Sequence, residues 1–366
     1  MDCLGMSTLR YGDFAERLKG GLGERYPVFG SIELTERCNL RCVHCYINQP
    51  AGDREARDRE LTLEQWRPIF DQLADAGCLW LLLTGGEIFL RPDFLDIYTY
   101  LRRKGFILVL FTNATLITPE IAGFLRDWRP FYMEVTLYGS TRETFERVTG
   151  VSGSFDRFLR GIELIDEAGI QYNLKSMIMT LNVHELYAMR EYAEDRGVTY
   201  RFDAIIQPRL DGQRDVRYLR LSPEEVVDLD LADPERVRSL RDGYVWAAAF
   251  PKTDDLFTCG AGRHAFHITA DGQLRICSGV RTPSYDLTRG TFQEGWNEFI
   301  PKIRRRKVSK DLPCIECDKQ ILCGQCPGFA ELENGDPESV VEYLCQIGHL
   351  RAHALDLSER SLVRHE

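Results

Sequence analysis

The chain has 366 residues, of which 44% are hydrophobic and 28% charged, and its formal net charge is -10. The length predicts a main domain plus a smaller one, and the composition is sufficient to bury a large core. The negative charge argues against nucleic acid as a partner. No apolar run is long enough to span a membrane, and the first thirty residues do not have the pattern of a signal peptide. We therefore expect a cytoplasmic protein without a membrane partner, whose 12 cysteines bind metal or serve catalysis instead of forming disulfides.

Residues 28 to 206 alternate between two kinds of pattern. Segments rich in β-branched, aromatic and leucine residues predict strands at 28–34, 79–84, 106–111, 131–137, 172–179 and 199–206. Helical patterns lie between them at 63–76, 93–104, 118–127, 154–168 and 184–196. Helix ends are marked by the capping residues Thr62 and Thr118 and by the glycines Gly77, Gly105, Gly169 and Gly197. Six strands with five crossover helices predict an α/β fold, a partial (β/α)6 barrel with its site at the C-terminal ends of the strands.

The alternation breaks after residue 206. A polar, turn-rich stretch and a bridging helix at 223–249 lead to a cysteine-dense region in which short strands at 265–277 flank an Asp-Gly turn. We expect this loop-rich region to depend on metal for its folding. The expected organisation is an N-terminal segment, a barrel, a linker, a small second domain and a tail, at 1–27, 28–206, 207–254, 255–350 and 351–366.

Three cysteines follow the first predicted strand in the pattern C-x3-C-x2-C: Cys38, Cys42 and Cys45. One interpretation is a zinc site completed by His44. Because His44 directly precedes Cys45, the two side chains are badly placed to bind the same ion. The other interpretation is a [4Fe–4S] cluster with three cysteine ligands and one open iron. The position of the motif at the predicted active end of the barrel favours the cluster.

The cysteine motif after the first strand of such a barrel resembles that of the radical S-adenosylmethionine (SAM) enzymes. The resemblance implies that the open iron binds SAM, which is cleaved reductively to a 5′-deoxyadenosyl radical that abstracts hydrogen from a substrate. It also implies SAM-binding roles for residues at later strand ends. These are Gly85, Gly86 and Glu87 of "TGGE", Asn113 of "FTNATLI", Thr136 of "VTLYGST" and Arg147. Ala114 stands where the family commonly has glycine.

The later cysteines resemble the SPASM domain, a C-terminal extension of this family with auxiliary iron–sulfur clusters. Cys259, Gly272 and Cys277 fit the start of its pattern, and "CIECDKQILCGQC" resembles the later run, although Cys323 and Cys326 are one residue closer than usual. By this resemblance one auxiliary cluster is bound by Cys314, Cys317, Cys323 and Cys345. The other, nearer the barrel, is bound by Cys259, Cys277 and Cys326 and lacks a fourth cysteine, with His264 and His267 near in sequence. The implied total is three clusters, all of the [4Fe–4S] type.

Members of the SPASM group mostly modify peptides or proteins, which makes a ribosomally made precursor peptide the leading substrate, with thioether or carbon–carbon crosslinking or oxidation as the reaction. The short segment before the first strand implies either a separate leader-peptide recognition protein or recognition without a leader, and the cluster chemistry implies a flavodoxin- or ferredoxin-type electron donor. The sulfatase-maturase subclass fits less well, because Ser278 stands where that subclass has an aspartate. The alternatives are a small-molecule substrate, such as a tetrapyrrole side chain or an aminocyclitol, and a non-enzymatic electron-transfer or scaffold protein.

Overall fold

The computed structural model describes residues 25–47 and 49–357. Its main feature is a nine-stranded sheet in the order β11-β10-β9-β1-β4-β5-β6-β7-β8. Six neighbouring strands run parallel and follow one another along the chain: β1 (Phe29–Thr35), β4 (Trp80–Gly85), β5 (Ile107–Thr112), β6 (Tyr132–Thr136), β7 (Tyr172–Met177) and β8 (Tyr200–Asp203). These correspond to the six predicted strands, and the partial barrel is confirmed.

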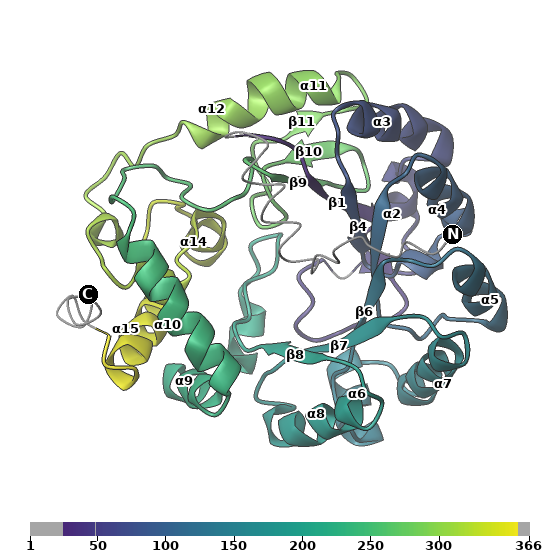
Figure 1. The fold of residues 1–366 in the computed structure, drawn as a ribbon, viewed down its shortest axis with the longest axis horizontal. Coiled ribbons are helices and arrows are strands. Elements are labelled where there is room, and N and C mark those ends of the chain that lie inside the picture. The colour runs from purple at the N-terminus through teal and green to yellow at the C-terminus, as the bar shows by residue number, and fades with distance from the viewer. Residues whose placement is uncertain (1–24, 48, 358–366) are drawn as a thin grey trace, which may run out of the picture.

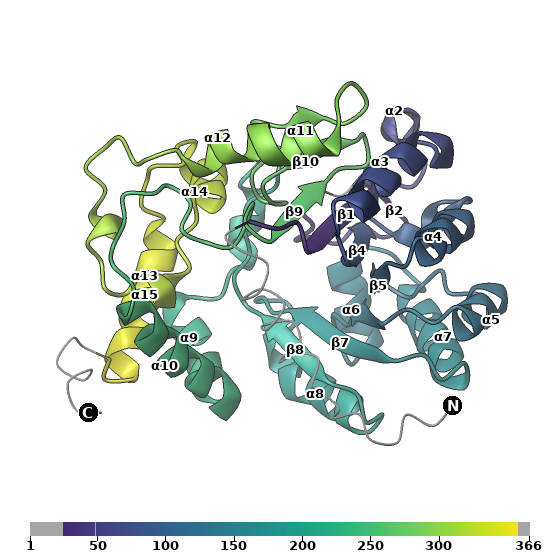
Figure 2. The same ribbon diagram turned by 45° about the horizontal axis from the view of Figure 1, so that its top comes forward.

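The five predicted helices are also present. They are α3 (Leu63–Asp75), α4 (Phe94–Arg103), α5 (Pro119–Asp127), α7 (Ser154–Glu167) and α8 (Leu186–Glu194). Figures 1 and 2 show them on the outer side of the curved sheet. The side chains of Thr62 and Thr118 accept hydrogen bonds from the backbone of α3 and α5, as their positions predicted. The sequence did not predict α2 (Arg54–Arg59) or α6 (Arg142–Thr149), since both are short and highly charged.

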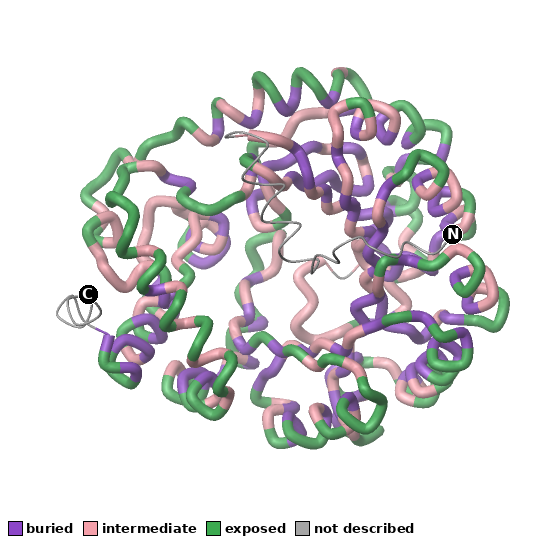
Figure 3. Tube along the Cα trace, viewed as in Figure 1, coloured by how far each residue is buried: buried purple, intermediate pink, exposed green. Residues whose placement is uncertain are grey.

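The hydrophobic core lies between the sheet and the outer helices. Alternate strand residues such as Ile32, Leu81 and Leu108 are fully buried against helix residues that include Trp66 and Phe70. Figure 3 shows the buried positions along the strands and on the sheet-facing sides of the helices. The residues between them point to the opposite, inner face of the sheet. That inner face carries charged side chains, among them Glu33, Glu134 and Lys175.

The region predicted as a small second domain begins by extending the barrel sheet. Strand β9 (Ala265–Ile268) pairs in parallel with β1, and β10 (Gln273–Arg275) and β11 (Tyr285–Asp286) follow in antiparallel pairing. The hairpin around the predicted Asp-Gly turn is therefore continuous with the barrel. Local pattern predicts this hairpin but not its partner, because β1 lies at the other end of the barrel sequence.

The bridging helix expected at 223–249 is wrong in one respect: it is two helices, α9 (Pro223–Leu231) and α10 (Pro234–Ala248). Pro234 has no N–H to donate to the preceding turn. The side chain of Asp233 instead caps a new helix by accepting from the N–H groups of Glu235 and Arg236 at 3.0 and 3.3 Å.

The remaining elements are short apart from the last helix. They are β2 (Arg37–Cys38), β3 (Gln49–Pro50), α11 (Phe292–Glu294), α12 (Ile300–Arg304), α13 (Gln320–Cys323), α14 (Pro327–Asn334) and α15 (Glu342–Ala354), with 3-10 turns at Ile88–Leu90, Val183–Glu185, Asp215–Leu219 and Pro313–Ile315 and a π-helical turn at Gly295–Phe299. In the part of the chain that the structure describes, no helix is both long and apolar enough to cross a membrane.

A buried ion-pair group joins α15 to the helices after the barrel. Asp230 at the end of α9 is 1% exposed and binds the guanidinium groups of Arg351 and Arg236, with N···O distances of 2.7 and 2.6 Å. Arg351 also donates to the carbonyl of Leu322 in α13 at 2.6 Å. The carboxylate thus holds α9, α10 and α15 together, and Arg351 links this group to α13.

Replacing Asp230 with alanine should lower the free energy of unfolding by about 3–5 kcal/mol, because the Arg351 guanidinium would be left buried without its anion. Chemical unfolding of the reconstituted protein measures this loss. Asp156→Ala is the control, since it breaks an exposed pair with Arg142, which lies 2.7 Å away, and should leave the unfolding midpoint at the wild-type value. Equal effects of the two variants would show that the buried group does not support this region.

Candidate active site

The three cysteines of the first motif lie in a loop that follows β1. The loop starts at β2 and ends at β3, and the two short strands pair in parallel. Its backbone is fastened to the end of α6, where the N–H groups of Arg41 and Val43 donate to the carbonyls of Thr149 and Val148 at 2.9 and 3.0 Å. Arg209 donates to the carbonyl of Cys45 at 2.9 Å. The loop is therefore fixed on one side by α6 and on the other by the segment that follows β8.

The three thiols lie close enough to influence one another. Burial, followed by the charges of the other two cysteines, raises the pKa of Cys42. Burial and Glu87 raise the pKa of Cys38 to about 12. Tyr138 lies near all three thiols. Burial raises the pKa of its phenol, and the charges of the three thiolates raise it further. The thiols must lose their protons to bind a metal, so loading the site would release protons.

His44, the fourth ligand in the zinc interpretation, packs against Tyr138. Its ring meets the ring of Tyr138 edge-on, with 4.8 Å between centroids, and burial lowers its pKa to about 4. Among the described residues, no group of three or more His, Cys, Asp or Glu side chains is placed to hold a single metal ion. A cubane cluster binds each thiolate at a separate iron and needs no ligand from His44.

Gly85 and Gly86 bring the end of β4 against the backbone that leads into the cysteine loop. Gly85 has a φ of 130°, and a Cβ atom on either residue would lie 2.1 Å from a carbonyl oxygen, that of Thr35 or Arg37. The N–H groups of Gly86 and Glu87 donate to these same carbonyls at 2.7 and 2.9 Å. The glycines were predicted to let the backbone approach a ligand, and the structure shows a second reason for them, this close approach between two chain segments.

Glu87 is fully buried and is hydrogen-bonded to the end of β5. Its carboxylate accepts from the hydroxyl of Thr112 at 2.7 Å and from the N–H of Asn113 at 2.8 Å. Burial raises the pKa of Glu87 to about 7, although these donors act in the opposite direction. A carboxylate has about four acceptor sites, so it retains capacity for a further donor such as an ammonium group.

Asn113 connects Glu87 to the cysteine loop. Its amide donates to Asn39 at 3.1 Å and lies 3.6 Å from the sulfur of Cys38. Its side-chain oxygen accepts from Thr115. The neighbouring Ala114 has a φ of 60°, a conformation that glycine adopts more readily, which explains why glycine is common at this position in the family it resembles.

The other two predicted SAM residues lie further from this network. Thr136 ends β6, with its hydroxyl 3.5 Å from the carbonyl of Thr112. Arg147 is exposed on α6 and donates to the carbonyl of Leu181 at 2.7 Å. The structure thus joins Glu87 and Asn113 to the cysteine loop and leaves Arg147 outside their hydrogen bonds. Tyr138, Asn39 and Thr112 were missed by sequence reasoning, although each lies within three residues of a predicted motif.

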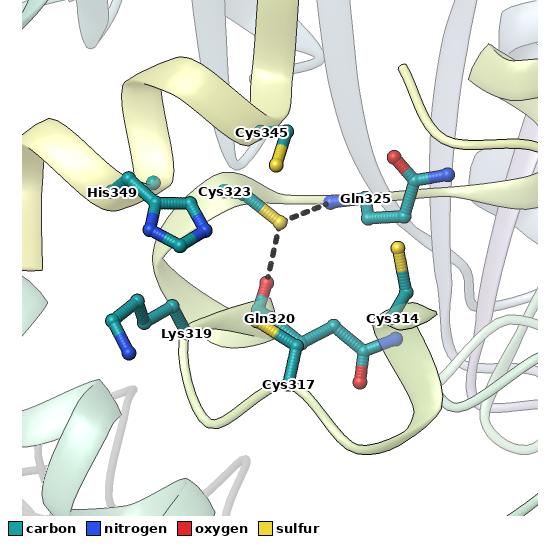
Figure 4. A pocket seen from close by; sticks show the side chains of 9 residues that line it. Cys314, Cys317, Lys319, Gln320, Cys323, Gln325, Cys345 and His349 are labelled. Carbon is teal, nitrogen blue, oxygen red and sulfur yellow. Dashed lines mark hydrogen bonds between the residues drawn. The ribbon is translucent and has the colours of Figure 1, made fainter. Parts of the chain in front are cut away.

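The four cysteines assigned to the distal cluster line one pocket. Figure 4 shows the side chains of Cys314, Cys317, Cys323 and Cys345 around it, with Lys319 and His349 at its edge. About 300 Å³ of space lies between these side chains when the opening to solvent is included.

A glycine of α15 allows this pocket to close. A Cβ atom on Gly348 would lie 2.5 Å from the Cβ of Cys323, so a larger residue would push α15, and with it Cys345, away from α13. Cys323 is already engaged locally, because its sulfur accepts from the N–H of Gln325 at 3.3 Å. The packing of α15 against α13 therefore determines the distance between Cys323 and Cys345.

The remaining three cysteines form a second group beside the β9–β10 hairpin. Burial raises the pKa of Cys277 to about 11, and Cys326 and Cys259 add to the increase, so the three thiols are neighbours. His267 is not directed to this group, because its ring lies 3.2 Å from the hydroxyl of Ser31 and 3.3 Å from the carboxylate of Glu33. The four cysteines assigned to the distal cluster thus line one pocket, and the charges of Cys326 and Cys259 reach Cys277.

Comparisons with known proteins agree with this geometry. A family model described as the radical SAM superfamily matches residues 32–194. An AdoMet-dependent heme synthase of Methanosarcina barkeri is 35% identical over 325 residues, covering 83% of this chain and 92% of the relative. The chain belongs to the radical SAM superfamily.

The other similar proteins include SPASM-type maturases and an Fe-coproporphyrin III synthase. Mycofactocin maturase MftC of Mycolicibacterium smegmatis is 32% identical over 333 residues, covering 86% of this chain and 83% of the relative. Fe-coproporphyrin III synthase of Methanosarcina barkeri is 36% identical over 195 residues, or 52% of this chain and 48% of that protein, so the chain spans about half of its length. The crystal structure of Streptococcus suis SuiB bound to precursor peptide SuiA shares the fold, with a TM-score of 0.66 at 16% identity over 94% of this chain and 84% of SuiB.

Replacing Glu87 with glutamine should weaken SAM binding about ten- to hundredfold, because a hydrogen bond to a charged group contributes roughly 1.5–3 kcal/mol. Glutamine keeps the shape and can still accept from Thr112. Because the pKa of Glu87 is raised to about 7, the carboxylate forms as pH rises through this value, and SAM affinity of the wild type should rise with it. Anaerobic calorimetric titration across this pH range measures both effects.

Glu120→Gln serves as the control for this experiment, since Glu120 is exposed in the first turn of α5. Its affinity and pH dependence should match those of the wild type. If the Glu87→Gln variant binds SAM as tightly as the wild type at every pH, Glu87 does not receive the ammonium group.

Proposed function

We propose that this radical SAM enzyme modifies a ribosomally made precursor peptide in the cytoplasm. The observation on which the proposal rests is the presence of two cysteine groups beyond the barrel, one of four residues around a pocket and one of three beside the β9–β10 hairpin. This arrangement resembles that of SPASM-type peptide maturases. The 32% identity to a maturase over most of both chains supports the same substrate class.

The residues assign the cofactors as follows. Cys38, Cys42 and Cys45 would hold an iron–sulfur cluster, which would supply the electron for reductive cleavage of SAM. Gly85, Gly86 and Glu87 shape the neighbouring SAM site, and Asn113, which lies between Glu87 and Cys38, faces the same ligand. Thr136 and Arg147 are assigned to the SAM site by family resemblance alone.

Two auxiliary clusters complete the proposed cofactor set. Cys314, Cys317, Cys323 and Cys345 hold the distal one, and Cys259, Cys277 and Cys326 hold the one nearer the barrel. With SAM bound beside Glu87, hydrogen abstraction would take place on the inner face of the barrel, and the auxiliary clusters would supply an electron acceptor for the substrate radical. The proposal includes a flavodoxin- or ferredoxin-type electron donor and a separate protein that recognises the leader peptide.

The second candidate substrate is a tetrapyrrole. The specific observation in its favour is the 35% identity to an AdoMet-dependent heme synthase over 92% of that relative. The barrel chemistry would be the same, and the difference would lie in what the inner face binds. The two candidates therefore call for one experiment with two arms.

The first arm co-expresses the protein with short reading frames encoded beside its gene and records the masses of the peptides. We expect a peptide whose mass changes, with tandem fragmentation locating the new bond or oxidation, and no change when Glu87 is replaced by glutamine. The second arm incubates the reduced, reconstituted enzyme with SAM and Fe-coproporphyrin III. Conversion of the porphyrin together with unmodified peptides would contradict the proposal and favour the tetrapyrrole.

A further inference from the structure

Polar side chains form a row on the inner face of the sheet where the cysteine-rich region joins the barrel. Ser31 of β1 pairs in register with His267 of β9, and His267 pairs with Arg275 of β10. Glu33 lies two residues after Ser31 and therefore on the same face. Arg281 approaches this row from the loop that follows β10, with its guanidinium 3.8 Å from the carboxylate of Glu33.

The hydrogen bonds of this row are incomplete. The carboxylate oxygens of Glu33 and one guanidinium nitrogen of Arg281 are buried without a well-aligned hydrogen bond, although the ring of His267 lies 3.3 Å from Glu33. Arg281 has its other contact with Glu36, at 3.4 Å. Buried charged groups are normally hydrogen-bonded, since desolvation without a partner is costly. A group of charges that lie near one another without closing their hydrogen bonds has the character of a site prepared for a ligand.

Arg275 is the clearest member of this group. It is 7% exposed, and its Nε and Nη1 atoms are buried with no hydrogen-bond partner. Within residues 25–47 and 49–357, no carboxylate lies within ion-pair distance of its guanidinium, whereas Arg281 has two. Arginine presents its N–H groups as a planar fork that matches a carboxylate. The two atoms lie on different edges of the guanidinium, so a carboxylate that accepts from Nε or from Nη1 would take Nη2 as its second donor.

This row lies between the first cysteine loop and the cysteine group that contains Cys277. At one end, Arg281 contacts Glu36 at 3.4 Å, and Glu36 lies two residues before Cys38. At the other end, Arg275 lies two residues before Cys277. A ligand held by the two arginines would thus lie between the cysteine loop and the auxiliary group nearer the barrel.

We propose that Arg275 and Arg281 bind a carboxylate group of the substrate and hold the reacting part of the molecule between these two cysteine groups. The nearby carboxylates of Glu33 and Glu36 favour a bound group that carries a single negative charge, such as one carboxylate, over a doubly charged phosphate group, because like charges repel. Arg281, with 24% of its side chain exposed, forms the side of the site that solvent reaches. This inference rests on the proposed function in placing the radical chemistry on the inner face, but the binding of a carboxylate can be tested without it.

The test uses glutarate, a small dicarboxylate, as the probe on the anaerobically reconstituted full chain. Calorimetric titration should give a dissociation constant on the order of 1 mM for the wild type. Arg275→Gln and Arg281→Gln should each raise it at least tenfold, and Arg275→Lys should lie between them and the wild type, because it keeps the charge and loses the fork. Iron content of each variant reports whether it has folded, and Arg281→Gln, at a partly exposed position, provides the result if Arg275→Gln does not fold.

Arg289→Gln is the matched control, because it removes one charge from the same segment at a side chain that is 87% exposed. Its glutarate affinity should equal that of the wild type. Absence of binding to the wild type at tens of millimolar, or equal binding by all variants, would overturn the inference. An Arg275→Gln variant with unchanged glutarate binding and a shifted auxiliary-cluster signal would also overturn it, since Arg275 would then serve the cluster.

A second arm separates this inference from the proposed function. The peptide identified by co-expression is compared with versions in which each acidic group is replaced by its amide. One such replacement should raise KM tenfold or more in the wild type and have no further effect in Arg281→Gln. If no peptide is modified but the glutarate result holds, the substrate class is wrong and the carboxylate site stands.

Discussion

The contact between the end of β4 and the backbone after β1 is the constraint on which the site depends. Gly85 and Gly86 allow the two segments to lie so close that a side chain on either would overlap a carbonyl oxygen of Thr35 or Arg37. This approach places Glu87 beside the start of the cysteine loop. From there a chain of hydrogen bonds runs through Asn113 to Asn39. Glu87, the candidate SAM residue, and the first cysteine loop are therefore supported by the same contacts.

A second constraint joins the cysteine-rich region to the barrel. Strand β9 adds to the sheet at β1, the strand that leads into the cysteine loop. The hairpin that carries Arg275 and ends near Cys277 is therefore held in register with Glu33. On the far side, the Asp230 group and the packing of Gly348 against Cys323 position α15. Three groups of cysteines, distant in sequence, are held in one structure by these few contacts.

The barrel was predictable because its signals are local. Apolar runs, the cap residues Thr62 and Thr118 and the glycines after the helices each mark an element within a few residues. The cysteine groups were predictable because their spacings resemble those of a known family. The pairing of β9 with β1 was not predictable, since it joins segments far apart in sequence, and neither was the break at Pro234 within a continuous helical pattern. The arginines of the inner face were missed for the same reason, because only register places Arg275 beside His267 and Glu33.

The central claim is that the first cysteine loop holds the cluster at which SAM is cleaved, while the other two groups hold separate clusters. Its most direct test is 5′-deoxyadenosine formation by a variant in which Cys38, Cys42 and Cys45 are all alanine, measured together with its iron content after anaerobic reconstitution. The account predicts no 5′-deoxyadenosine and a loss of about one third of the iron of the wild type, with the auxiliary clusters retained. Continued SAM cleavage by this variant, or stoichiometric zinc in place of iron in the wild type, would contradict it.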